Sequence, residues 1–196
     1  SITKAVTAAL VLQLRDEGRL DLDAPFKTYL PGYPGSGADA VTIHQLLNHT
    51  SGLSNYDSLL PYEEAEKQGL ELYQRPHTTD QILERLARGK VAGEPGKKFD
   101  YNNHDYVILG KVIEALAGKP FDVVLKERIL NPVGMADTGM LRRLAITKRL
   151  ARTYWRPKGS QELTNDWPMY YENWYAAGSM FSTAADLQKF ADALYG

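Results

Sequence analysis

The chain has 196 residues, of which 43% are hydrophobic and 24% are charged, with a formal net charge of −1. This length fits one domain, or one domain of two subdomains, and the near-zero charge gives no sign of the basic stripe that binds nucleic acid. The absence of cysteine excludes disulfides and thiolate metal sites, and no apolar run is long enough to cross a bilayer.

The first predicted element is a helix over residues 1–17. Its apolar residues Val6, Leu10 and Leu14 recur every four positions, a spacing that places them on one face of a helix. Gly18 follows directly, and glycine is common just past the C-terminal end of a helix. The chain is therefore expected to open with an amphipathic helix.

Two capping boxes predict the starts of two further helices. The sequence TIHQ (42–45) begins a short helix that ends near His49, and TTDQ (78–81) begins one that ends at Gly89. In such a box the Thr and the Gln satisfy each other's backbone N–H groups. Residues 50–77, between these two helices, are predicted to be largely loop.

The remaining sequence predicts more helices than strands. Helices are expected over residues 103–117 and 120–130, where apolar residues repeat with helical spacing, and a strand-like segment covers residues 151–155. Thr183 caps the last predicted helix, whose buried side chains are expected to be Leu187, Phe190 and Leu194. Strands that could build a large sheet are few.

Ser1 and Lys4 are candidates for catalysis because they stand three residues apart at a helix start. Such positions share a helix face with Cβ atoms about 5–6 Å apart, which allows a hydrogen bond between the side chains. A serine hydroxyl becomes a good nucleophile when a base takes its proton, and a lysine can be that base only when its amine is uncharged. The structural alternative is an N-cap serine with a lysine on the surface.

Tyr101-Asn-Asn103 is a second candidate. A phenol near a Ser/Lys pair can pass protons, and an amide beside it can bind a carbonyl or steady the lysine. The structural alternative is a turn before the helix, with Asn103 as its N-cap. Spacing alone does not decide, since Tyr171-Glu-Asn173 has the same form.

Five stretches in order resemble the class C β-lactamase and DD-peptidase superfamily, which also contains esterases and D-aminopeptidases. The first is Ser1–Lys4 with its helix and the following DEGRLDLDAPFKTYLP. The others are TIHQLLNHTSGL (42–53), PGKKFDYNNHDYVILGKVIEALAGKPF (95–121), ERILNPVGMADTG (127–139) and AAGSMFSTAADLQKFADAL (176–194). The resemblance covers essentially the whole chain, and it selects Tyr101 over Tyr171.

The resemblance implies a role for each candidate. Ser1 would be the nucleophile, Lys4 its base partner, Tyr101 the proton-relay tyrosine and Asn103 an amide contact to the substrate. The implied fold is α+β, of the serine β-lactamase/DD-peptidase-like (transpeptidase-like) kind.

The same resemblance implies that residues 1–196 form an incomplete catalytic domain. This fragment would be predominantly helical and would lack most of the antiparallel sheet. Residues 1–17 would be the nucleophile helix, about 24–150 a helical subdomain, and 151–196 the return towards the missing sheet.

One family motif is absent. The third motif, Lys-Thr-Gly or His-x-Gly on a sheet strand, would line the cleft and give one of two oxyanion-hole amides. The only Lys-x-Gly, Lys67-Gln-Gly69, lies in a polar segment with no strand pattern. The sequence is expected to be a fragment that is truncated at both ends. We therefore expect N- and C-terminal segments of the same protein to complete the site, and the fragment alone to lack activity.

Two other patterns are interpreted as structural. Glu127-Arg-Ile-Leu-Asn131 matches the Glu-x-x-Leu-Asn pattern that orients the hydrolytic water in class A β-lactamases, but it lies inside a predicted helix with Glu127 in solvent. The four histidines lack metal-ligand spacing, and His49 is expected to hydrogen-bond within its own turn. No metal or other cofactor is expected.

The sequence thus predicts a serine hydrolase that acts through an acyl-enzyme. The expected partner is a small-molecule or peptide substrate: a β-lactam, a D-amino-acid peptide or amide, or a small ester. One alternative is a non-catalytic β-lactamase-like scaffold or regulatory protein. Another is an N-terminal-nucleophile hydrolase that uses the amine of Ser1, although such enzymes place the nucleophile on a strand. The resemblance favours a periplasmic or secreted location in bacteria.

Overall fold

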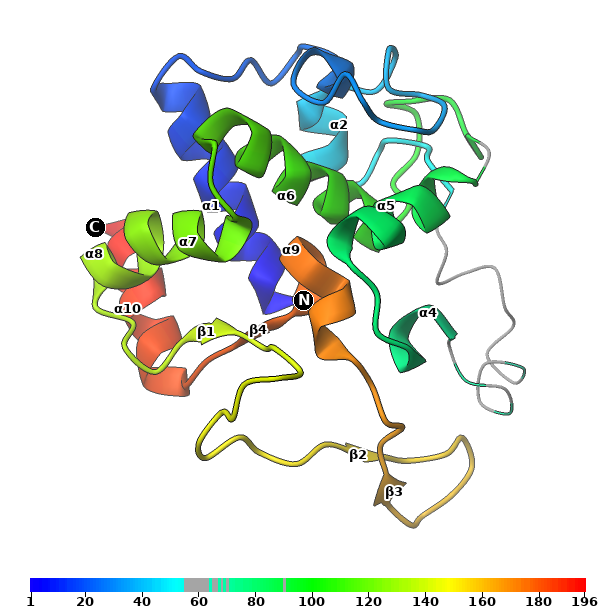
Figure 1. Ribbon diagram of the computed structural model, residues 1–196, viewed down its shortest axis with the longest axis vertical. Helices are drawn as coiled ribbons and strands as arrows, with labels where there is room; N and C mark the ends of the chain where they lie inside the picture. The colour runs from blue at the N-terminus through cyan, green and yellow to red at the C-terminus, as the bar shows by residue number, and fades with distance from the viewer. Residues whose placement is uncertain (55–63, 65–66, 68, 70, 90) are drawn as a thin grey trace.

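The computed structural model of the chain describes residues 1–54, 64, 67, 69, 71–89 and 91–196. Its helices are α1 (Ile2–Asp16), η1 (Phe26–Thr28), α2 (Ile43–Leu47), α4 (Glu71–Gln74), α5 (Thr79–Ala87), α6 (Asn103–Ala117), α7 (Phe121–Leu125), the π-helical turn η3 (Lys126–Leu130), α8 (Asn131–Val133), η4 (Tyr171–Trp174), α9 (Tyr175–Gly178) and α10 (Ala184–Tyr195). Its strands are β1 (Gly139–Met140), β2 (Tyr154–Trp155), β3 (Thr164–Asn165) and β4 (Met180–Phe181). Figure 1 shows this arrangement.

Both predicted capping boxes are present. The side chain of Thr42 accepts from the backbone N–H of Gln45, whose side chain accepts from the N–H of Thr42, and α2 begins there. An equivalent box begins α5. Within residues 50–77, which were predicted to be largely loop, the structure contains the short helix α4. That helix forms because its inner side buries a leucine and a tyrosine, a tertiary contact that so short a segment does not encode. Residues 55–63, 65–66, 68 and 70 of the predicted loop lie outside the described residues.

Helix α6 begins one residue earlier than an N-cap at Asn103 would place it. The N-cap is Asn102, whose side-chain oxygen accepts from the N–H of His104, so Asn103 is the first helical residue and not the cap. At the other end Gly118 adopts a left-handed φ of 66°, the conformation that commonly closes a helix. This one-residue difference determines where the side chain of Asn103 can reach.

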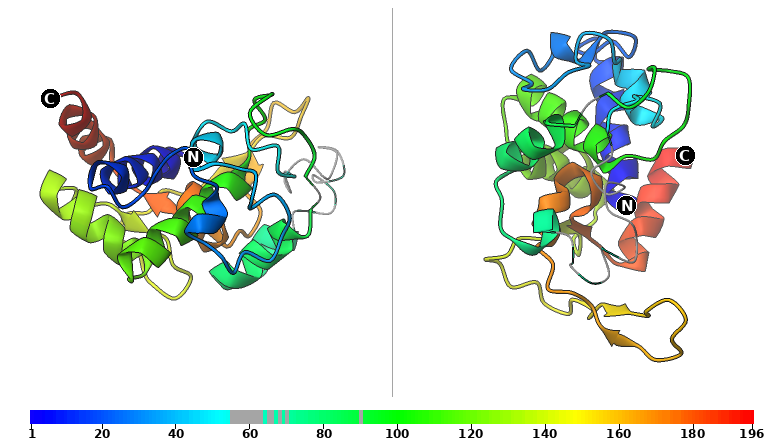
Figure 2. Two further views of the ribbon diagram at one scale, coloured as in Figure 1. Left: turned by 90° about the horizontal axis from the view of Figure 1, so that it is seen from above. Right: turned by 90° about the vertical axis from the view of Figure 1, so that its right-hand side faces the viewer.

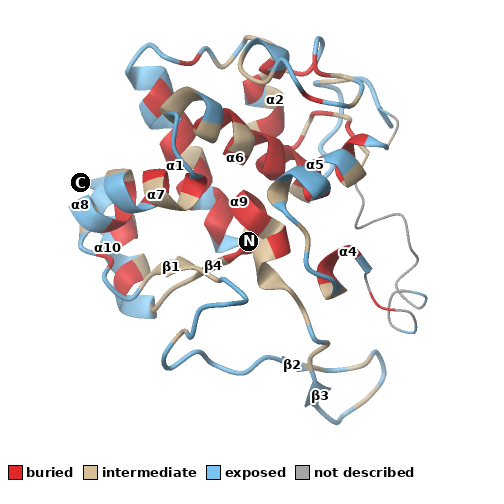
Figure 3. Cartoon of the chain, in the orientation of Figure 1, coloured by how far each residue is buried: buried red, intermediate tan, exposed pale blue. Residues whose placement is uncertain are grey.

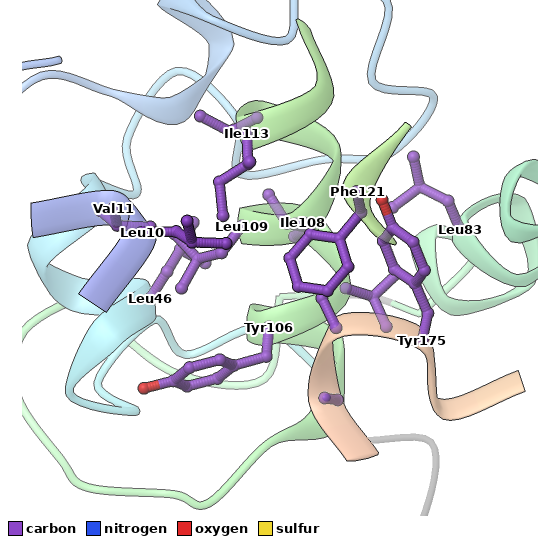
Figure 4. Close-up of a cluster of buried hydrophobic side chains, with 14 of the residues drawn as sticks. Leu10, Val11, Leu46, Leu83, Tyr106, Ile108, Leu109, Ile113, Phe121 and Tyr175 are labelled. Carbon is purple, nitrogen blue, oxygen red and sulfur yellow. The ribbon is translucent and has the colours of Figure 1, made fainter. Parts of the chain in front are cut away.

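The core is built around α6. Figure 4 shows side chains of α1, α2, α5, α7 and α9 gathered around this helix; among those fully or almost fully buried are Leu10, Val11, Leu46, Ile108, Leu109, Ile113 and Phe121. Helix α1 runs beside α6, and α9 packs against both. Figure 3 shows buried residues on all three of these helices. Burying such side chains is the main source of stability and fixes the start of α1 against α9.

Gly110 permits a close approach of α6 and α9. A Cβ atom at this position would lie 2.4 Å from a ring carbon of Tyr175 and 2.5 Å from the Cβ of Ala176. Real Cβ atoms do not come so close to other atoms, so only glycine fits here without a shift of α9. The short helix α9 is therefore held directly against the centre of the core.

The sheet content is small. Strands β1 and β4 pair antiparallel, with Gly139 opposite Phe181, and β2 and β3 form a second antiparallel pair. The β2–β3 hairpin extends away from the helices in Figure 1 and in the right-hand view of Figure 2. The predicted fold class, a predominantly helical part of an α+β fold that lacks most of the sheet, is confirmed.

Helix α10 differs from its prediction in what it buries. Phe190 is buried as expected, but Leu194 is 54% exposed, because the far end of this helix extends beyond the elements that its first turns contact. Its first turn is held by Asp186, which accepts from the backbone N–H of Asp137 and from the hydroxyl of Thr138.

Within the described ranges, no helix has the length and apolar character that crossing a membrane requires.

Candidate active site

The serine and the lysine meet at the start of α1. Ser1 stands at the N-cap position, but its side chain makes no capping hydrogen bond. Lys4 is only 6% exposed, and its Nζ lies 3.4 Å from Ser1 Oγ. The structural alternative for this pair, an N-cap serine with a surface lysine, is therefore wrong. Because Ser1 begins a helix and not a strand, the structure also disfavours the N-terminal-nucleophile alternative.

Tyr101 reaches Ser1 from the loop before α6. Its Oη lies 2.6 Å from Ser1 Oγ, and either oxygen could be the donor. The ring of Tyr101 also lies against Lys4, whose Nζ is 4.9 Å from the ring centroid. The structure thus brings together the three residues that the sequence proposed for proton transfer, from two segments 100 residues apart.

Asn103 points at the lysine. Its Oδ1 accepts a 2.6 Å hydrogen bond from Lys4 Nζ. This contact is possible because Asn102 caps α6, which places Asn103 on the first helical turn facing α1. Of the two amide roles considered for Asn103, the geometry shows the contact with the lysine.

A carbonyl group that sequence reasoning missed completes the surroundings of Lys4. The backbone oxygen of Ala177, in α9, accepts a 2.7 Å hydrogen bond from Nζ. Thr7, one turn after Lys4, donates from its hydroxyl to the neighbouring carbonyl of Ala176 at 2.8 Å. The sequence AAGSM (176–180) matched a family stretch, but a backbone acceptor has no side-chain signature.

The surroundings of His49 also differ from the prediction. Its Nδ1 does not bond within its own turn but lies 3.1 Å from Oδ2 of the fully buried Asp105 and accepts from the backbone N–H of Asn102 at 3.2 Å. Asp105 was not singled out from the sequence. Burial raises the pKa of this carboxyl to about 6, although its hydrogen bonds to His49 and Ser51 act in the opposite direction.

The remaining sequence candidates lie elsewhere. Tyr171 bonds to Thr153 and Asp166, and the amide of Asn173 donates to the carbonyls of Leu72 and Arg75, so this second Tyr-x-Asn is structural. Glu127 is exposed and pairs with Lys119, as its prediction as a solvated helix residue implies. Of the Lys67-Gln-Gly69 sequence, residue 68 lies outside the described residues.

The site as described is open to solvent. Ser1 is exposed and Tyr101 is 41% exposed, while Lys4 and Asp105 are buried. One face of this constellation can therefore receive a carbonyl group, and the other is fixed to the core. Chemically, the arrangement offers an alcohol, an amine and a phenol in one hydrogen-bonded chain, the groups needed to form and break an ester.

Comparisons with known proteins agree on one family. Residues 1–195 match the family model described as Beta-lactamase. The chain is 35% identical over 154 residues to Esterase EstB of Burkholderia gladioli, an alignment that covers 72% of this chain and 37% of the esterase.

Two solved structures are similar over the whole chain. The D-stereospecific amidohydrolase from a Streptomyces species has a TM-score of 0.83 and 33% identity, covering 99% of this chain and 59% of that one. The D-amino acid amidase from Ochrobactrum anthropi SV3 has a TM-score of 0.82 and 30% identity, with coverages of 100% and 53%. The chain spans about half the length of the curated relatives that it matches. This chain belongs to the Beta-lactamase family.

Proposed function

We propose that the protein containing this chain is a serine hydrolase that acts through an acyl-enzyme on Ser1. The observation that carries the proposal is the hydrogen-bonded set of Ser1 Oγ, Tyr101 Oη and Lys4 Nζ at the start of a helix. A helix N-terminus also stabilises negative charge that develops during attack on a carbonyl. The family match and the hydrolases among the similar proteins support it.

Lys4 is placed to act as the base. An uncharged amine has two N–H groups and one lone pair. The two shorter contacts of Nζ, 2.6 Å to Asn103 Oδ1 and 2.7 Å to Ala177 O, use both N–H groups. Nζ donates to its third neighbour, Ser1 Oγ, at 3.4 Å, and in the uncharged amine the lone pair takes the place of this third N–H. Both acceptors are uncharged amide oxygens, and together they fix the orientation of Nζ next to Ser1.

Tyr101 is placed to pass the proton onward. In the proposed first step Ser1 Oγ bonds to the substrate carbonyl carbon, and its proton moves to Lys4 directly or through the Tyr101 hydroxyl. When the intermediate collapses, the bond from carbon to the leaving nitrogen or oxygen breaks, and that atom receives the proton from Tyr101. Water then attacks the acyl-enzyme, and the same groups return the proton to Ser1.

The substrate class that we propose first is an amide of a D-amino acid. The support is the similarity of the whole chain to two enzymes, one named a D-stereospecific amidohydrolase and the other a D-amino acid amidase. A small ester is the second candidate, because of the identity to an esterase. Ester and amide hydrolysis share the same acyl-enzyme, so the distinction lies in the part of the cleft that holds the substrate side chain.

We propose further that residues outside this chain complete the cleft. Ser1 and Tyr101 are open to solvent, the chain spans about half of its relatives, and it lacks a Lys-Thr-Gly or His-x-Gly sequence. In this arrangement residues 1–17 supply the nucleophile helix, about 24–150 the helical subdomain, and 151–196 lead towards the sheet. The fragment alone should then have little or no activity.

The test uses the full native gene product that contains this chain. Release of ammonia from D-phenylalanine amide and L-phenylalanine amide, hydrolysis of p-nitrophenyl acetate and opening of a chromogenic cephalosporin are measured for wild type and for Ser1→Ala. We expect hydrolysis of the D-amide in preference to the L-amide, and its loss in Ser1→Ala. Equal rates for wild type and Ser1→Ala with all four substrates would instead support a non-catalytic scaffold or regulator.

A further inference from the structure

His49 holds a backbone conformation that few side chains adopt. It follows α2 and its C-cap residue Asn48, and its φ of 59° lies in the left-handed region. Glycine, and less often asparagine, occupies this position after a helix, because a Cβ atom is crowded there. A buried histidine kept in this strained conformation indicates that the ring itself has a task.

The ring of His49 lies against the segment that carries the proposed relay tyrosine. Its centroid is 4.6 Å from that of the Tyr101 ring and 5.9 Å from that of Phe99. The backbone N–H of Asn102 donates to Nδ1, and the N–H of Asp100 donates to the carbonyl of His49 at 2.8 Å. Residues 99–102, the segment before α6, therefore contact both the ring and the backbone of His49.

Asp105 fixes the orientation of that ring from α6. Its Oδ2 contacts His49 Nδ1 at 3.1 Å, and its Oδ1 accepts from the hydroxyl of Ser51 at 2.6 Å. The Ser51 hydroxyl oxygen in turn accepts from the backbone N–H of Leu53. All three polar side chains are buried, and hydrogen bonds between buried polar groups restrict these side chains to few arrangements.

We propose that His49 and Asp105 are a positioning pair for the hydroxyl of Tyr101. Asp105 orients the imidazole, and the imidazole fixes the Tyr101 ring and the peptide that follows it. The pair acts through Tyr101, so its members are positioning residues and not catalytic ones. This inference rests on the proposed function of Tyr101, and its tests therefore include one that does not need activity.

Two substitutions of His49 separate its ring from its backbone conformation. His49→Gly keeps the left-handed conformation, because glycine adopts it freely, and removes the ring. His49→Asn also tolerates this conformation, and its amide oxygen can replace Nδ1 as the acceptor for the N–H of Asn102. Both variants are therefore expected to fold, and the asparagine variant should retain part of the positioning.

The first test measures hydrogen exchange of the full native protein and needs no substrate. In His49→Gly we expect the amides of residues 99–103 to exchange about 10-fold faster or more, because the segment loses its anchor. In His49→Asn the increase should be smaller. Unchanged exchange over this segment in the glycine variant would overturn the proposal, whether or not the protein is a hydrolase.

The second test is a double-mutant cycle on the Ser1-dependent hydrolysis. We expect His49→Gly to lower kcat by about 10- to 100-fold with little change in KM, since a misplacement of about 1 Å has costs of this size. In a Tyr101→Phe background the same substitution should have little further effect, because the group that it positions is gone. Equal fold losses in the two backgrounds would show a merely structural role and contradict the inference.

Tyr33→Phe is the matched control. It removes another buried hydrogen bond to a histidine at the start of α6, that of Tyr33 Oη with His104 Nε2 at 3.0 Å. We expect lower stability with kcat close to wild type, and no coupling to Tyr101→Phe. A loss of kcat as large as that of His49→Gly would mean that any weakening at the start of α6 has this effect, and would overturn the assignment to His49.

If wild type and Ser1→Ala hydrolyse equally, the proposed function fails. Hydrogen exchange alone then tests whether His49 and Asp105 position the segment that carries Tyr101.

Discussion

Tyr101 Oη lies 2.6 Å from Ser1 Oγ, although 100 residues separate the two in sequence. The contact between Tyr101 and Ser1 depends on two separate packing arrangements. Helix α1 must dock on α6 and α9, and the segment before α6 must close over the start of α1. Each side chain is then held by buried neighbours while its hydroxyl faces solvent, which is the arrangement that attack on an external carbonyl requires.

The hydroxyl of Tyr101 is the first group to test. In Tyr101→Phe we expect kcat to fall by about 10²- to 10⁴-fold, the range for loss of a general acid–base group, with KM little changed. Stability should change little, because Tyr101 is 41% exposed. Steady-state kinetics and thermal melting of the same sample check both. The matched control is Tyr154→Phe, which removes the hydroxyl of another exposed tyrosine, on the β2–β3 hairpin, and should leave kcat unchanged.

Lys4 is tested by removing its amine without leaving a cavity. Lys4→Met has a chain of similar length that cannot accept a proton, so acylation should slow by about 10²- to 10⁴-fold. Lys4→Arg should be as slow, because a guanidinium remains charged and is not a base. Pre-steady-state acylation by a chromogenic ester measures both variants. A fast Lys4→Arg variant would show that Lys4 serves only as a positive charge.

Gly110 connects core packing to the site. In Gly110→Ala the new Cβ would meet the Tyr175 ring and Ala176, so α9 must move and carry the carbonyl of Ala177 away from Lys4. We expect a loss of about 1–3 kcal/mol in the free energy of unfolding, together with a lower kcat. Chemical denaturation and kinetics measure the two effects. Gly32→Ala is the control, because a Cβ there has no atom within 4 Å, and it should change neither.

His104 gives the protein a specific sensitivity to acid. Burial lowers the pKa of its imidazole from 6.5 to about 4. The folded pKa lies below the unfolded one, so the neutral ring's contribution to stability is complete above pH 6.5 and is lost as the pH falls towards 4. Between pH 7 and pH 4 we expect wild type to lose about 3 kcal/mol more than His104→Gln.

Chemical denaturation at the two pH values measures this difference. The substitution also removes the bond to Tyr33, but that loss occurs at both pH values and cancels in the comparison. Equal losses on acidification for wild type and variant would show that His104 is not the group responsible.

Much of the local structure could be predicted from sequence, because it depends on short-range rules. The boxes at Thr42 and Thr78 and the helix bounds near Ala117 follow from capping chemistry and helical spacing over a few residues. The Ser1–Lys4 pair follows from the geometry of one helical turn. The exposed end of α10 and the helix α4 were missed, because burial there depends on which distant elements are present to pack against.

The side chains of the site could be predicted from the sequence, but the buried groups that hold them in place could not. Ser1, Lys4, Tyr101 and Asn103 lie together as the resemblance implied, and their catalytic roles stay proposals. The carbonyl of Ala177 was missed because a backbone oxygen carries no sequence signal. The bond between His49 and Asp105 was missed because pairing across 56 residues depends on tertiary structure, and a histidine after a helix is locally compatible with a simple turn.

The most direct test of the central claim is to locate the covalent intermediate. The full native gene product is mixed with a fluorophosphonate or a slowly hydrolysed acyl donor, quenched in acid and digested, and the modified peptide is sequenced by mass spectrometry. The adduct is expected on Ser1 in wild type, much more slowly in Lys4→Met, and not in Ser1→Ala. An adduct on any other residue, or one that forms equally fast in Ser1→Ala, would contradict the assignment of Ser1 as the nucleophile.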